Sequence, residues 1–171
     1  SGAMYDATTA SSNTAIGWSN LANITTGNDN TALGFQVGHT LTTTGKTVLI
    51  GYQAGYAINS TDANGTVAIG YAAGTAITSG QRSALVGYQA GDSITTGDRN
   101  TAFGYQALMT ATTGNRNVAI GHGALRDIPA GVHNDNTAVG TDAGHDTTTA
   151  SGSVFIGKDA GYDVTTGNQN I

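Results

Sequence analysis

The chain of 171 residues has a formal net charge of -5, and only 10% of its residues are charged, against roughly 25% in a typical soluble domain. It contains 26 glycines, one proline, no cysteine and no glutamate. This composition excludes disulfides and gives no electrostatic basis for binding nucleic acid. It also offers no apolar run near the roughly 20 residues that a membrane-spanning helix needs, so neither nucleic acid nor a membrane span is expected.

The N-terminus divides into two short segments before the regular part of the chain begins. Residues 1–4, Ser-Gly-Ala-Met, are typical of a cloning remnant, and we expect the fold to start after them. Residues 5–12 form a lead-in, and residues 13–171 are expected to form a single domain.

A repeat dominates this domain. The glycine of a recurring Ala-Ile-Gly motif marks nine units, with a spacing of 17 residues in most units and 19 residues in two. These glycines are Gly17, Gly34, Gly51, Gly70, Gly87, Gly104, Gly121, Gly140 and Gly157. An aliphatic or Phe residue precedes each of them, and an aromatic residue follows the first six. Such periodicity is typical of solenoids.

Each unit predicts a strand of four or five residues around Thr-Ala-Ile-Gly-Tyr, because β-branched and aromatic residues alternate there between Asn and Gly turn formers. A second short strand is expected in the Ile-Thr-Thr segment, as at 24–26. Seventeen residues cannot bury a core alone, so we predict an all-β parallel β-solenoid of nine coils, stacked at about 4.8 Å. A compact sandwich with regular hairpins is the alternative fold.

Two columns of the repeat have a predicted structural role. Gly17 and its equivalents lie inside the strands, where they leave room for a close approach of the neighbouring backbone. The asparagine column at one corner fits either a ladder of side-chain amides or simple turn formation. Its members are Asn13, Asn30, Asn100, Asn117, Asn136 and Asn170.

The strands are apolar on both faces. Around Gly87, Val86 and Tyr88 point one way and Leu85 points the other, and only one of these faces can fill the interior of a coil. We therefore predict that a homotrimer covers the second face. The candidate interface is Ile50, Ile69, Val86, Phe103, Ile120, Tyr52, Tyr71, Tyr88 and Tyr105. A stripe on which carbohydrate stacks is the competing interpretation of the aromatic column.

The segments Asn13-Thr14-Ala15-Ile16-Gly17 and Val86-Gly87-Tyr88-Gln89-Ala90-Gly91 resemble the repeats of bacteriophage tail-fibre and tailspike proteins. They are also similar to the Ala-Ile-Gly repeats in YadA-like heads of trimeric autotransporter adhesins. The resemblance covers residues 13–171 and implies a homotrimer of left-handed β-rolls. It implies a structural, non-enzymatic fibre segment, on a virion or another extracellular surface, that attaches to a host glycan or protein receptor. YadA-like heads use a shorter unit.

The two longer units predict contact loops. Their extra residues follow Ile58 and Ile128, four coils apart, and insertions in solenoids map to loops on one face, often the binding face. The candidate receptor-contact residues are Asn59, Ser60, Thr61, Asp62, Asn64, Pro129, His133, Asn134 and Asp135. A length variation without a role is the alternative.

No spacing of residues predicts a catalytic centre, a cofactor or a metal site. His39 and His145 share a repeat position but lie six coils apart. An acidic corner, with Asp142 above Asp159 and Asp146 near Asp163, is expected to be a solvated face. The basic residues Lys46, Arg82, Arg99 and Arg116 share a position and are expected to pair with Asp from a neighbouring chain or to extend into water.

Ice binding is the second function considered. Thr-Thr pairs recur at Thr25-Thr26, Thr42-Thr43 and Thr95-Thr96, and flat threonine arrays on solenoids can order water. Adjacent residues of a strand point to opposite sides, so only one threonine of each pair is expected at the surface.

Overall fold

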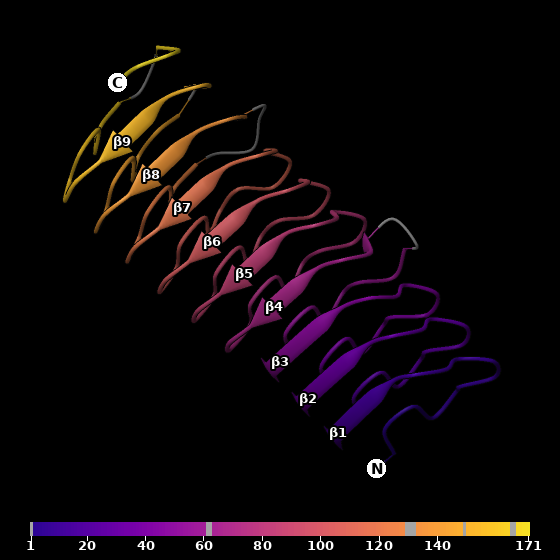
Figure 1. The fold of residues 1–171 in the computed structure, drawn as a ribbon. Helices are drawn as coiled ribbons and strands as arrows, with labels where there is room; N and C mark the ends of the chain where they lie inside the picture. Colours follow the sequence, from indigo (N-terminus) through magenta and orange to yellow (C-terminus); the bar gives the residue numbers. More distant parts are fainter. Residues whose placement is uncertain (1, 61–62, 129–132, 149, 165–166) are drawn as a thin grey trace.

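The computed structural model describes residues 2–60, 63–128, 133–148, 150–164 and 167–171. Within them, each strand is followed by a loop that returns to the next strand of one sheet (Figure 1). The strands are β1 (Thr14–Trp18), β2 (Thr31–Phe35), β3 (Val48–Tyr52), β4 (Val67–Ile69), β5 (Ala84–Val86), β6 (Thr101–Phe103), β7 (Val118–Ile120), β8 (Thr137–Val139) and β9 (Val154–Ile156).

The strands follow one another through the sheet in chain order, and all eight pairings between β1 and β9 are parallel. Equal positions of neighbouring repeats lie side by side, as Gly17 and Gly34 do. The register also holds across a 19-residue unit, where Ile50 pairs with Ile69. The predicted all-β parallel solenoid is therefore confirmed, and the hairpin sandwich is wrong.

The second predicted strand is absent from the described Ile-Thr-Thr segments. Three consecutive backbone N–H groups, of Thr25, Thr26 and Gly27, donate to the single carbonyl of Thr42. A parallel ladder spaces its hydrogen bonds evenly along both strands, so this convergence marks a bend. The β-branched threonines suggested a strand, but the backbone turns here to begin the next corner.

The glycine column permits the strands to stack. Gly34 has φ +140°, and a Cβ added to it would collide with the carbonyl oxygen of Gly51 in the next coil. The same collision awaits a Cβ at Gly87, whose φ is +139°, against the carbonyl of Gly104. These positions need both the missing side chain and the positive φ that glycine tolerates, which confirms the predicted close approach.

The core fills the inside of each coil with two columns that exchange size. Leu85 of β5 is fully buried, and its methyl groups reach the space beside Gly74 and Gly91. Where the strand carries a small residue, as at Ala102 of β6, a leucine replaces the glycine of the same coil, Leu108. Leucine takes this position even though its φ of 55° lies in the left-handed region. Each coil is thus packed from one side or the other.

The asparagine column forms the predicted side-chain ladder. The Oδ1 of Asn117 accepts hydrogen bonds from the backbone N–H of Asn136 at 3.1 Å and from its Nδ2 at 3.2 Å. Asn100 accepts in the same way from Asn117. All three side chains are fully buried, so the ladder satisfies polar groups that would otherwise be costly to bury.

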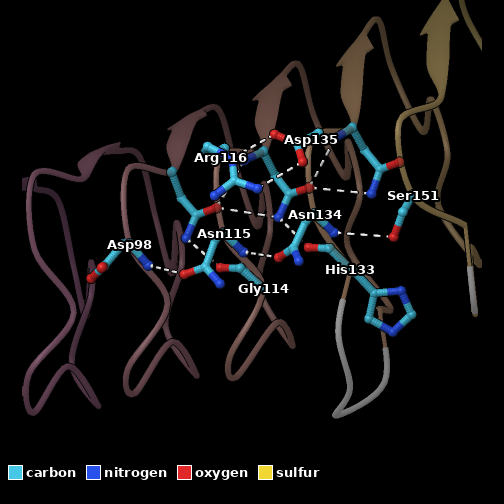
Figure 2. Close-up of polar contacts among 11 residues, drawn as sticks. Asp98, Gly114, Asn115, Arg116, His133, Asn134, Asp135 and Ser151 are labelled. Carbon is cyan, nitrogen blue, oxygen red and sulfur yellow. Dashed lines mark hydrogen bonds and ion pairs between the residues drawn. The ribbon is translucent and has the colours of Figure 1, made fainter.

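A second ladder lies two residues away and runs in the opposite direction (Figure 2). Here the backbone N–H of one coil donates to the side chain of the following coil. Asp98 N donates to Asn115 Oδ1 at 2.7 Å, Asn115 N to Asn134 Oδ1 at 2.8 Å, and Asn134 N to Ser151 Oγ at 3.3 Å. The two ladders together fasten each coil to both of its neighbours.

The N-terminal segment follows the path of a coil. Met4 N donates to Asn20 O, Asp6 N to Ala22 O, and the Met4 side chain packs against the core. The fold therefore begins within the residues that the sequence had set aside, because the first coil needs a cover.

Candidate functional site

The outward face of the sheet is the largest chemically uniform surface in the described chain. Three columns of side chains form it, beginning at Thr14, Ile16 and Trp18 and repeating in every coil. They contain no Asp, Lys or Arg before Lys158 in the last coil. Many of these apolar side chains are exposed; Phe103, for example, is 58% exposed and Tyr105 is 46% exposed.

All nine residues of the predicted interface lie on this face. Tyr52, Tyr71, Tyr88 and Tyr105 are exposed, as are Phe103 and Ile120, and the remaining three are half-buried. Their inward neighbours, such as Leu85, are fully buried. The predicted division into a covered and an uncovered apolar face is therefore present in the single chain.

The aromatic column is a continuous stack of seven rings. Neighbouring centroids lie 4.9–5.2 Å apart and neighbouring planes differ by at most 12°. The stack consists of Trp18, Phe35, Tyr52, Tyr71, Tyr88, Tyr105 and His122. Because each ring covers the face of the next, the column presents ring edges outward. A sugar that stacks on an aromatic face has access only at an end of the column, which disfavours the carbohydrate interpretation.

The two longer units return to the common register immediately after their extra residues. Asn64 accepts from Gly45 N at 2.7 Å and Asn134 accepts from Asn115 N at 2.8 Å, each across 19 residues. The insertions are thus confined between a buried isoleucine, Ile58 or Ile128, and the second ladder. Both occur at the same edge of the solenoid.

The candidate contact residues divide into several groups. Asn59, Asn64 and Asp135 are exposed, and Ser60 and Asn134 are half-buried. Thr61, Asp62 and Pro129 lie outside the described residues. His133 is 4% exposed, so its side chain is not presented to a receptor, because the chain re-enters the coil at this residue (Figure 2).

The basic column has a partner within its own chain at one point. Arg116 Nε lies 2.6 Å from Asp135 Oδ1, and Arg116 Nη2 lies 2.8 Å from Asp135 Oδ2 (Figure 2). These hydrogen bonds lower the pKa of the Asp135 carboxyl and raise that of the Arg116 guanidinium. Neither predicted environment, water or a neighbouring chain, describes Arg116. The pair is fully exposed, so it orients the side chains without contributing much stability.

Shortening both loops to the 17-residue norm is expected to leave the fold intact, since Asn64 and Asn134 resume the ladder independently of the extra residues. Circular dichroism and thermal melting of the shortened chain measure this. If the loops contact the receptor, adsorption to host cells or glycan falls in the same variant. Undiminished adsorption by a folded variant would remove the loops as the contact site.

The threonine pairs present one hydroxyl per coil, as predicted. The Oγ1 of Thr25 donates to Thr42 O at 3.2 Å, and that of Thr95 donates to Thr112 O at 3.0 Å. The second residue of each pair, for example Thr96, is exposed. A single file of exposed hydroxyls gives little support to ice binding.

Charge is concentrated at the C-terminal end. Residues 1–126 contain five Asp and five Lys or Arg, whereas residues 127–171 contain six Asp and one Lys. The whole net charge of -5 therefore lies in the last coils. The acidic corner predicted there includes one further residue, Asp127, which aligns with Asp146 when each is counted from the glycine of its own coil.

His145 lies within this acidic region. Its Nδ1 is 2.7 Å from Asp146 Oδ1, its Nε2 is 3.6 Å from Asp127 Oδ2, and its ring stacks on Tyr162 with centroids 4.9 Å apart. Sequence reasoning examined His145 only against His39, six coils away, and so missed the two carboxylates. Counting positions from Gly121 and Gly140 would have found them.

No protein-family model, curated protein or solved structure matches this chain. The described part of the chain contains no helix that could cross a bilayer.

Proposed function

We propose that this chain is a segment of a trimeric surface fibre, with a structural and host-attachment role, of the kind found in bacteriophage tail fibres. The observation that carries the proposal is the exposed apolar face of the sheet. In a single chain, Phe103, Tyr105 and Ile120 would meet water on a surface without charge. Exposed apolar area of this kind marks an association site.

The size of the face supports the proposal. Nine strands at about 4.8 Å and five residues at about 3.3 Å give a face of about 43 Å by 16 Å, or about 700 Å². This exceeds the patch of about 300–600 Å² that a monomer usually exposes. It approaches the roughly 800 Å² that each partner contributes to a standard protein interface.

The number of chains rests on the resemblance to trimeric fibres. Two such sheets packed face to face would also cover the columns, and identical rods associate about a symmetry axis in either case. The head of a bacterial trimeric autotransporter adhesin shares the same architecture and role, and differs in the surface that carries it. Attachment then falls to surfaces that remain outside the interface, including the exposed residues of the longer loops.

A triple substitution tests the association. Replacing Ile69, Val86 and Ile120 by Asp places three charges on the outward face, and we expect the assembly to dissociate or unfold, because an unpaired charge is costly to bury. Light scattering and analytical ultracentrifugation measure the mass. The matched control replaces Thr26, Thr43 and Thr96, which are exposed at another corner, by Asp.

The control should retain the mass of the native assembly. A triple variant of the outward face that keeps the same mass as the native chain would show that this face is not the interface.

A further inference from the structure

The side chains of Asp127, His145 and Asp146 form a cluster that joins two consecutive coils. One ligand atom from each residue lies within 4.8 Å of the others. The His145 side chain is only 10% exposed, whereas those of Asp127 and Asp146 are 39% and 43% exposed. The imidazole is therefore held in place while one edge of the cluster stays open to solvent.

The two nitrogens of His145 have different surroundings. The contact of 2.7 Å between Nδ1 and Asp146 Oδ1 is a hydrogen bond, and a carboxylate can only accept, so Nδ1 carries the proton. In the neutral ring, Nε2 then carries a lone pair. That lone pair lies 3.6 Å from Asp127 Oδ2, another acceptor. Two acceptors that face each other at this distance need a cation between them.

We propose that Asp127 and His145 bind a divalent zinc-like metal ion, with Asp146 as the residue that orients the imidazole. Zinc binds imidazole nitrogen at about 2.0–2.1 Å and carboxylate oxygen at about 2.0–2.2 Å, so two ligands of a tetrahedral site lie about 3.4 Å apart. The separation of 3.6 Å between Nε2 and Oδ2 already matches this spacing. A carboxylate behind a metal-bound histidine fixes its tautomer and raises its basicity.

The surroundings favour a cation. Loss of solvent contact, and after it the negative charges of Asp146, Asp142, Asp163 and Asp159, raise the pKa of Tyr162, the residue that stacks on His145. The nearest basic group is Arg126, whose Nε lies 3.8 Å from the other oxygen of Asp127, Oδ1. Asp127 Oδ2 therefore stays available to a metal ion.

The chain holds a natural comparison at His39. This residue occupies the same repeat position as His145, but Asn23 and Thr40 stand where His145 has Asp127 and Asp146. The Nδ1 of His39 lies 3.3 Å from Ser19 Oγ. With no carboxylate on either side, His39 lacks the features that would bind a metal ion.

Zinc titration of the purified chain by isothermal titration calorimetry tests the proposal, with the amount bound expressed per chain. We expect one zinc per chain and a rise in melting temperature with zinc, because binding to the folded state stabilises it. His145→Gln should abolish this binding. Asp127→Asn should weaken it, and Asp146→Ala should weaken it by about 10–100-fold, the usual effect of losing such a supporting carboxylate.

His39→Gln and His122→Gln are the controls, since His122 lies 3.4 Å from the single carboxylate of Asp142. Both should bind zinc as the native chain does, and circular dichroism establishes that every variant is folded. The absence of saturable zinc binding, or binding that a folded His145→Gln chain retains, would overturn the proposal. Neither result depends on whether the chain forms a trimer.

Discussion

Replacing Gly87 with alanine is expected to destabilise the solenoid by at least about 3 kcal/mol, close to the largest effect of any single methyl group in this chain. A left-handed φ costs a residue other than glycine about 1–3 kcal/mol. The new Cβ would also collide with the carbonyl oxygen of Gly104, which is backbone and cannot rotate away. Relieving the collision means separating β5 from β6. Thermal and denaturant unfolding measure the loss.

Gly157 provides the matched control for this substitution. It occupies the same repeat position with φ +122°, but nothing lies within 4 Å of a Cβ added there, because no strand follows β9. Gly157→Ala should therefore carry only the conformational cost, about 1–3 kcal/mol or less at a fraying end. Equal losses for the two variants would show that close approach of the strands is not what requires glycine.

Leu85→Ala is expected to cost about 2–5 kcal/mol, the usual range for removing a buried leucine. Leu85 is fully buried, and its methyl groups fill the space beside two glycines, Gly74 and Gly91. Neither glycine can fill the cavity, and the neighbouring coils are fixed by the strand register. Unfolding by denaturant gives the free energy.

A second substitution should restore part of this loss. Gly91→Leu alone is expected to destabilise the chain, since a Cβ at Gly91 would lie 2.8 Å from Leu85 Cδ2. In combination with Leu85→Ala it reproduces the arrangement of the next coil, where Ala102 faces Leu108. A double-mutant cycle should therefore give a favourable coupling. Simple additivity of the two losses would mean that the two columns do not share one space.

The strands and their register could be predicted because they depend on a repeated motif. The glycine spacing placed every strand, and the alternation around Gly87 identified the inward and outward faces correctly. The second strand was predicted wrongly because threonine favours strands, whereas the backbone N–H groups of residues 25–27 converge on one carbonyl. Backbone hydrogen bonding outweighed side-chain preference there.

The features that were missed do not repeat by residue type. The second ladder uses Asp98, Asn115, Asn134 and Ser151, four side chains that share only an oxygen in the same place. The face-to-face stacking of the aromatic column depends on a common side-chain orientation, which spacing does not specify. The cluster around His145 combines two coils of a 19-residue unit, so a search at 17 residues passes over it.

The mass of the native chain in solution tests the central claim most directly. Light scattering at micromolar concentration should give three times the 17.1 kDa of one chain, because the outward apolar face needs two neighbours to cover it about an axis. A stable species of 17.1 kDa would contradict the fibre assembly, and the exposed face would then need another explanation.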